Sequence, residues 1–114
     1  KNELFNSKIA LNLSQGKPLK YYSSDRIAQL MGNGIATLID KKTKLNKLFS
    51  NQEAIFYDSN SDLNKKLNLM LKNHKLRNKL AKKGREVYHK KFNSINVADF
   101  MICKIFNINK KFNW

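Results

Sequence analysis

Cysteine is nearly absent from this sequence, since Cys103 is the only one among 114 residues. No disulfide can therefore form within the chain. Cys103 lies in the apolar stretch ADFMICKIF, which favours a small buried residue over a catalytic thiol. The two histidines are far apart and have no acidic or cysteine neighbours at the spacing of metal ligands. We therefore expect no metal site, because a structural zinc needs about four ligands.

Long hydrophobic runs are also absent. No stretch approaches the roughly 20 apolar residues that a helix needs to span a bilayer. The chain starts at Lys1 and shows no signal-peptide pattern. We expect a cytoplasmic protein, with contact at the inner face of the membrane left open, and we interpret the start at Lys1 as that of a fragment of a longer protein.

Acidic residues are few, eight against 23 basic ones, which gives a net charge of +15. Such a charge invites a nucleic-acid interpretation. However, only three of the basic residues are arginine, and the lysines are mixed with many asparagines and isoleucines, a bias expected from an A/T-rich coding sequence. The aromatic residues do not interleave with the basic ones as a base-stacking platform requires. Nucleic-acid binding is therefore the weaker alternative, and a phosphorylated small molecule or an anionic membrane surface fits the charge equally well.

Three short apolar runs predict buried strands, at Ser7–Ser14, Gly34–Asp40 and Glu53–Asp58. Helices are predicted between them, at Asp25–Gly32 and Lys42–Phe49. Strands joined through helices form βαβ units, which imply parallel pairing and right-handed crossovers. The predicted fold class is therefore α/β.

The remainder of the chain predicts C-terminal helices with lysine-rich solvated faces. The first covers Ser59–Asn73, the second starts at Asn73 or His74, and the last covers roughly Ser94–Phe106. Gly84 interrupts the apolar stripe of the second helix, which suggests close packing against a neighbour, because a mid-helix glycine costs about 1 kcal/mol. We expect the tail after Phe106 to be frayed or to pack on something absent. The residues expected on the inward faces are Leu63, Leu67, Met70 and Leu71, then Leu76, Leu80, Val87 and Tyr88, and finally Val97, Phe100, Met101 and Ile105.

The most individual stretch is SSDRIAQLMGNG, Ser23–Gly34, directly before an apolar run. A helix starting at Asp25 would begin at the carboxyl end of the first strand, where its unpaired N–H groups attract phosphate. Arg26 in the first turn can add a bidentate fork to the same anion. Gln29 lies three residues on, on the same face, where its amide can bind a sugar hydroxyl. The alternative is an ordinary arginine and glutamine on the surface of an amphipathic helix.

Three stretches together resemble the C-terminal half of GT-B glycosyltransferases of the type called glycosyl transferases group 1. They are SSDRIAQLMGNGIATLID, KLNKLFSNQEAIFYDSNSDLNKKLNLML and RNKLAKKGREVYHKKF. The shared pattern begins with an arginine, a Glu or Gln three residues on, and a glycine turn into a strand. A short helix ending in Phe follows, and then an acidic residue before a hydrophobic strand and a helix that starts with an acidic residue and Leu. A closing helix with the pattern R…A..G…V…F completes it. The likeness extends from Ser7 to Phe106. Its specificity comes from order and spacing rather than from any one motif.

The resemblance implies a Rossmann-like parallel sheet with flanking helices that ends in two or three C-terminal helices, an incomplete half of a GT-B fold. Residues 1–114 would form a donor-binding domain for a nucleotide-diphosphate sugar, with no other cofactor. Arg26 would contact the diphosphate, and Gln29 would stand where many relatives hold the ribose with Glu. The residues expected around the nucleotide or sugar are Ser14, Gln15, Gly16, Lys17, Tyr22, Ser23 and Ser24.

The chain departs from the family pattern in two ways. The EX7E signature of retaining enzymes would place carboxylates at Tyr21 and Gln29, and neither residue is acidic. The chain is also too short for both Rossmann-like halves, and its own half is short by a strand or two at the front. We therefore assign no catalytic residue and expect no transfer by this chain alone. The N-terminal domain of the same parent chain is the expected partner, and an exposed interdomain face would favour self-association.

Two other function classes remain as alternatives. A small basic nucleic-acid-binding module would bind polynucleotides with a steep salt dependence. A non-catalytic α/β interaction domain, such as a response-regulator-like fold, would need acidic residues clustered at its strand ends. The first two predicted strand ends show no such cluster, so this class ranks last.

Overall fold

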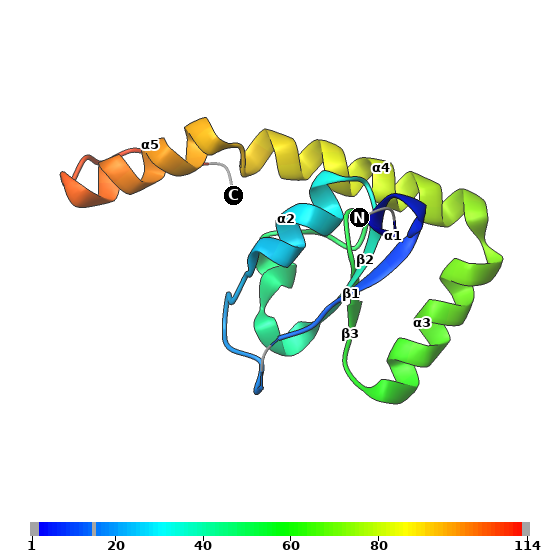
Figure 1. Cartoon of the computed structure of the whole chain (residues 1–114). Coiled ribbons are helices and arrows are strands. Elements are labelled where there is room, and N and C mark those ends of the chain that lie inside the picture. Colours follow the sequence, from blue (N-terminus) through cyan, green and yellow to red (C-terminus); the bar gives the residue numbers. More distant parts are fainter. Residues whose placement is uncertain (1–2, 15, 113–114) are drawn as a thin grey trace.

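A computed structural model describes residues 3–14 and 16–112 of the chain (Figure 1). A small sheet lies at the centre, and the long C-terminal helices run beside and beyond it. The elements are α1 (Glu3–Asn6), β1 (Ile9–Asn12), α2 (Asp25–Gly32), β2 (Ala36–Asp40), the 3-10 turns η1 (Lys41–Thr43) and η2 (Leu45–Lys47), β3 (Ile55–Tyr57), α3 (Asn60–Lys72), α4 (His74–Lys91) and α5 (Ser94–Ile105).

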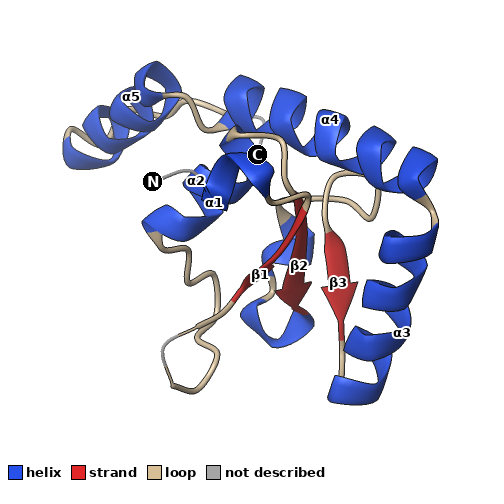
Figure 2. Ribbon diagram, turned by 45° about the vertical axis from the view of Figure 1, so that its right-hand side comes forward, coloured by secondary structure: helices blue, strands red, loops and turns tan. Residues whose placement is uncertain are grey.

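The three strands form one parallel sheet in the order β1-β2-β3, and Figure 2 shows them side by side. Ile9 is opposite Ala36, and Leu38 is opposite Ile55. Each strand connects to the next through a helical segment, as the βαβ pattern predicts. The Rossmann-like parallel sheet followed by C-terminal helices is therefore confirmed. The short helix α1 was not predicted.

Both faces of the sheet are covered, which explains why β2 is apolar without alternation. Ile39 faces the side of α2, η2 and the C-terminal half of α4, whereas its neighbour Leu38 faces α3. The first cluster contains Ile27, Met31, Ile39, Leu45, Phe49, Ala54 and Phe56. The second contains Leu38, Ile55, Tyr57, Met70 and Leu80. The fold is thus a three-layer arrangement with a core on each side of the sheet.

The prediction of a single helix over Lys42–Phe49 is wrong. The segment forms the two 3-10 turns η1 and η2, separated by Lys44 in the left-handed region at φ 59°. The Asp40 side chain accepts a hydrogen bond of 2.8 Å from the Lys42 N–H, and the Thr43 hydroxyl donates to the Asp40 carbonyl at 2.6 Å. These bonds tighten the chain directly after β2, and an α-helix cannot pass through Lys44 in that conformation.

Helix α3 matches its predicted range to within one residue at each end, and α4 begins at His74 as predicted. Two residues expected on their inward faces are nevertheless exposed. Leu71 and Leu76 are exposed to solvent, whereas Met70 and Leu80 are buried. Gly84 does pack closely as predicted, since a Cβ there would lie 2.4 Å from the Glu53 carbonyl oxygen.

The inward face predicted for the last helix is wrong. Val97, Met101 and Ile105 are exposed, and Cys103 is the buried residue among the helix positions described. The physical reason is that α5 extends beyond the sheet and has no core beneath it. The described part of the tail is not frayed, because it folds back on α5, where the Phe112 ring meets the Phe100 ring edge-on at 5.3 Å.

Candidate functional site

The candidate site lies where β1 ends and α2 begins. Ser24 is the N-cap residue of α2, in extended conformation, and its side chain makes no capping bond. The Ser24 hydroxyl oxygen is buried and has no hydrogen-bond partner among the described residues. The first N–H groups of a helix lack partners inside the helix. This end of α2 therefore offers polar groups to a ligand or to water.

Asn12, the last residue of β1, adds a second polar group at the same place. Its side chain is only 4% exposed, and its carbonyl oxygen Oδ1 has no partner within the part of the chain that the structure describes. Asn12 is opposite Ile39, which belongs to the cluster on the α2 side, so Asn12 faces that side too. A buried amide oxygen without a partner costs free energy, which a bound donor group would offset.

Arg26 brings a positive charge to this end of the sheet. Its guanidinium donates a hydrogen bond of 2.7 Å to the carbonyl oxygen of Leu13, the first residue after β1. The side chain is exposed, and this bond uses one of its five N–H donors. Arg26 therefore ties the loop to α2 and still presents N–H groups to solvent at the carboxyl end of the sheet.

The structure distributes the predicted site residues along the loop from β1 to α2. Gln15 lies outside the described residues. Gly16, at φ 72°, and Lys17 are exposed. The loop then passes the turn η1 that follows β2, where the Tyr21 N–H donates to the Thr43 carbonyl at 2.7 Å. The residues half-buried near the two ends of the loop are Ser14, Tyr22 and Ser24, and Ser23 is exposed. Gln29 lies within α2 and is exposed.

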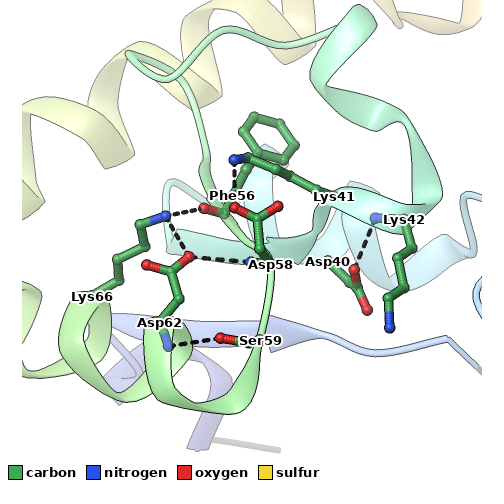
Figure 3. Close-up of polar contacts among 8 residues, drawn as sticks. All are labelled: Asp40, Lys41, Lys42, Phe56, Asp58, Ser59, Asp62 and Lys66. Atoms are coloured by element: carbon green, nitrogen blue, oxygen red, sulfur yellow. Dashed lines mark hydrogen bonds and ion pairs between the residues drawn. The ribbon is translucent and has the colours of Figure 1, made fainter.

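A second polar cluster occupies the carboxyl ends of β2 and β3 (Figure 3). Lys41 pairs with Asp58 at 2.7 Å, and Lys66 pairs with Asp62 at the same distance. Asp62 also accepts from the Asp58 N–H at 3.1 Å. The hydrogen bond from Lys66 lowers the pKa of Asp62, and the one to Asp58 raises the pKa of Lys41. Both carboxylates are paired with lysines, which offsets their repulsion of an anion at this edge.

A comparison with protein-family models decides the family. The glycosyl transferase-like model matches residues 2–102, nearly the whole chain. The chain belongs to the glycosyl transferase-like family. Comparison with curated proteins gave no match, and comparison with solved structures gave none. Membership confirms the resemblance to glycosyl transferases of the group 1 type and gives the chain a role in glycosyl transfer.

For a glycosyl transferase-like chain, Asn12 is the candidate residue that sequence reasoning missed. It stood inside a run interpreted as an apolar strand, although it is polar among Ile9, Leu11 and Leu13. That single polar position was the available signal. Its burial and its lack of a partner emerge only when α2 is placed over the end of β1.

Among residues 3–14 and 16–112, no group of three or more histidine, cysteine or acidic side chains is placed to hold a metal ion. No helix in the same described ranges is long and apolar enough to cross a membrane.

The Asp62 pair leads to a pH prediction. Because the folded-state pKa of Asp62 is lowered, its stabilising effect is fully present above the unfolded pKa, about 4, and is lost as the pH falls through the folded pKa. We expect Asp62→Asn to lower the free energy of unfolding near neutral pH, and the difference from wild type to shrink below about pH 4. Urea unfolding of both proteins across this range measures it. A difference that stays constant with pH would contradict the assignment.

Proposed function

We propose that this chain is the donor-binding part of a GT-B glycosyltransferase that transfers a sugar to a glycan or a lipid-linked acceptor. The observation that carries the proposal is the contact between Arg26 and the chain at the end of β1. Its guanidinium lies on Leu13, beside the N-terminus of α2 and the unpartnered side chains of Asn12 and Ser24. Ligands of open α/β sheets bind at this edge, outside the carboxyl ends of the strands.

In this proposal the α2 N-terminus and Arg26 bind the diphosphate of a nucleotide sugar. The helix supplies N–H groups and the positive end of its dipole, and the guanidinium supplies a charged fork. Gln29, one turn along α2, binds the ribose hydroxyls with a neutral amide. The loop residues that enclose the nucleotide or sugar are Ser14, Gln15, Gly16, Lys17, Tyr22, Ser23 and Ser24. Tyr21 and Gln29 offer no carboxylate, so we assign no catalytic residue to the chain.

We further propose that the N-terminal domain of the parent chain completes the sheet and the cleft, and that this chain alone is inactive. The two sheet edges support this. On β3, Lys66 donates to the outward Phe56 carbonyl at 2.6 Å, which blocks further pairing. On β1, the bond from Ala36 N–H to Lys8 carbonyl leaves the backbone groups of Ile9 and Leu11 facing away from β2. The strand has no charged residue to prevent another strand from pairing there.

The proposal places the protein in the cytoplasm, where nucleotide sugars are available to it. The net charge of +15 attracts a donor with several negative charges more strongly than a substrate with a single negative charge.

Titration with nucleoside diphosphates tests the site. We expect uridine, guanosine or adenosine diphosphate to shift backbone NMR signals at the start of α2 and at the end of β1. Arg26→Ala should weaken binding about 10- to 100-fold, because it removes a charge-assisted hydrogen bond of about 1.5–3 kcal/mol. Arg85→Ala is the matched control, since Arg85 is exposed and packs on Gly34 at the opposite end of β2.

Two results would count against the proposal. One is the absence of shifts at millimolar nucleotide, and the other is equal weakening by Arg26→Ala and Arg85→Ala. Shifts with a polynucleotide that follow the lysines of α4 and vanish with added salt would instead favour the nucleic-acid alternative.

A further inference from the structure

Helix α5 presents a continuous apolar stripe to solvent. Each of its members has another member three or four residues away, so they lie on one face of the helix. Ile95 is 78% exposed and Ile105 is 69% exposed, and Phe106, just after the helix, is 70% exposed. The stripe, as the term is used below, consists of Ile95, Ala98, Met101, Ile102, Ile105 and Phe106.

The opposite face of α5 is already covered by the chain's own tail. The chain reverses direction after α5, where the Ile108 N–H closes the helix end on the Cys103 carbonyl at 2.8 Å, and Lys110 then pairs with Asp99. The Phe112 ring packs against Phe100. The tail therefore covers the side that carries the acid and the buried cysteine. What remains exposed is the apolar side, and large exposed apolar surfaces of this kind mark interaction sites.

The positive charge around α5 indicates what kind of partner binds to the stripe. From Lys90 to the C-terminus the sequence has five lysines and one aspartate, and that aspartate is neutralised by Lys110. Lys104 lies on α5 next to Phe100, on the side that the tail covers, with its ammonium group 5.6 Å from the centre of the Phe100 ring. A second copy of the chain would bring another +15 against this one, which opposes self-association. The surface fits a partner that is both apolar and anionic.

We propose that α5 docks the protein on an anionic lipid surface, with the stripe buried among the acyl chains and the lysines at the headgroups. Interfacial helices bind by apolar burial together with attraction to anionic lipids, and they lie in the plane of the membrane without crossing it. The position of α5 suits this, because the helix extends past the body of the molecule (Figure 1). Helix α5 therefore lies clear of the sheet.

Co-sedimentation with vesicles tests the proposal on the whole chain. We expect binding to vesicles of phosphatidylglycerol mixed with phosphatidylcholine, weaker binding to phosphatidylcholine alone, and a loss of binding as salt screens the lysines. The double variant Ile102→Asp with Ile105→Asp should lower the partition coefficient at least about tenfold. Leu71→Asp is the matched control, because Leu71 is 52% exposed on α3 and away from the stripe.

The outcomes separate cleanly. All variants should keep the melting temperature of the wild type, since each changed side chain is exposed. The proposal is overturned by no sedimentation with anionic vesicles, or by equal loss in the Leu71→Asp control. It is also overturned by a lipid-free dimer in analytical ultracentrifugation that the double variant dissociates, because the stripe would then bind a second copy.

Discussion

Replacing Ile39 with alanine is expected to lower the free energy of unfolding by about 2–5 kcal/mol. Ile39 lies in the central strand, has no exposed surface, and packs with Ile27, Met31 and Phe49. The substitution removes the transfer free energy of the lost carbons and leaves a cavity between the sheet and α2. A domain of this size has only a small total stability, so the loss is a large fraction of it.

Urea unfolding followed by circular dichroism measures the change, with Ile95→Ala as the control. Ile95 has the same side chain at 78% exposure on α5, so its truncation should change the free energy of unfolding by no more than about 0.5 kcal/mol. Equal effects of the two substitutions would mean that β2 is not the buried centre of the sheet.

Replacing Gly84 with alanine is expected to lower the free energy of unfolding by about 1–3 kcal/mol. The new Cβ would lie 2.4 Å from the Glu53 carbonyl oxygen, which belongs to the backbone directly before β3. A flexible side chain could move aside, but this backbone cannot shift without displacing β3. The clash therefore outweighs the gain of about 1 kcal/mol that alanine brings to a helix interior.

Gly32→Ala is the matched control for Gly84→Ala. A Cβ at Gly32 would meet side-chain atoms of Tyr88 and His89 at 4.0 Å, which is ordinary contact. Thermal or urea unfolding should show no loss for Gly32→Ala and a gain of up to about 1 kcal/mol. A neutral or stabilising effect of Gly84→Ala would mean that α4 does not pack as closely on the Glu53 backbone as the structure shows.

Local signals in the sequence predicted α2 to the residue. Cap residues precede Asp25, apolar residues recur at helical spacing, and glycines follow, so the predicted and observed helix both cover Asp25–Gly32. All of these signals act within a few residues of one another. The prediction for Lys42–Phe49 was wrong because its apolar residues suit an α-helix and a pair of 3-10 turns alike. The structure has the turns, with the Asp40 side chain accepting a hydrogen bond from the Lys42 N–H.

The faces of the C-terminal helices show the limit of periodicity. In α5, apolar residues occur on both sides of the helix, so spacing alone could not say which side is buried. The predicted side contained Met101 and Ile105, which the structure leaves exposed. The returning tail covers the other side of α5 through its contacts with Phe100 and Asp99, and these contacts have no signature within the helix itself.

For the candidate site, the sequence alone placed Arg26 and Gln29 one turn apart at the start of a helix that follows a strand, because caps, spacing and strand runs are short-range properties. Only the tertiary structure brought Arg26 to Leu13 and left Asn12 and Ser24 buried without partners. Those contacts depend on how α2 crosses the sheet. The packing of the whole core decides that crossing, and no short stretch of sequence encodes it.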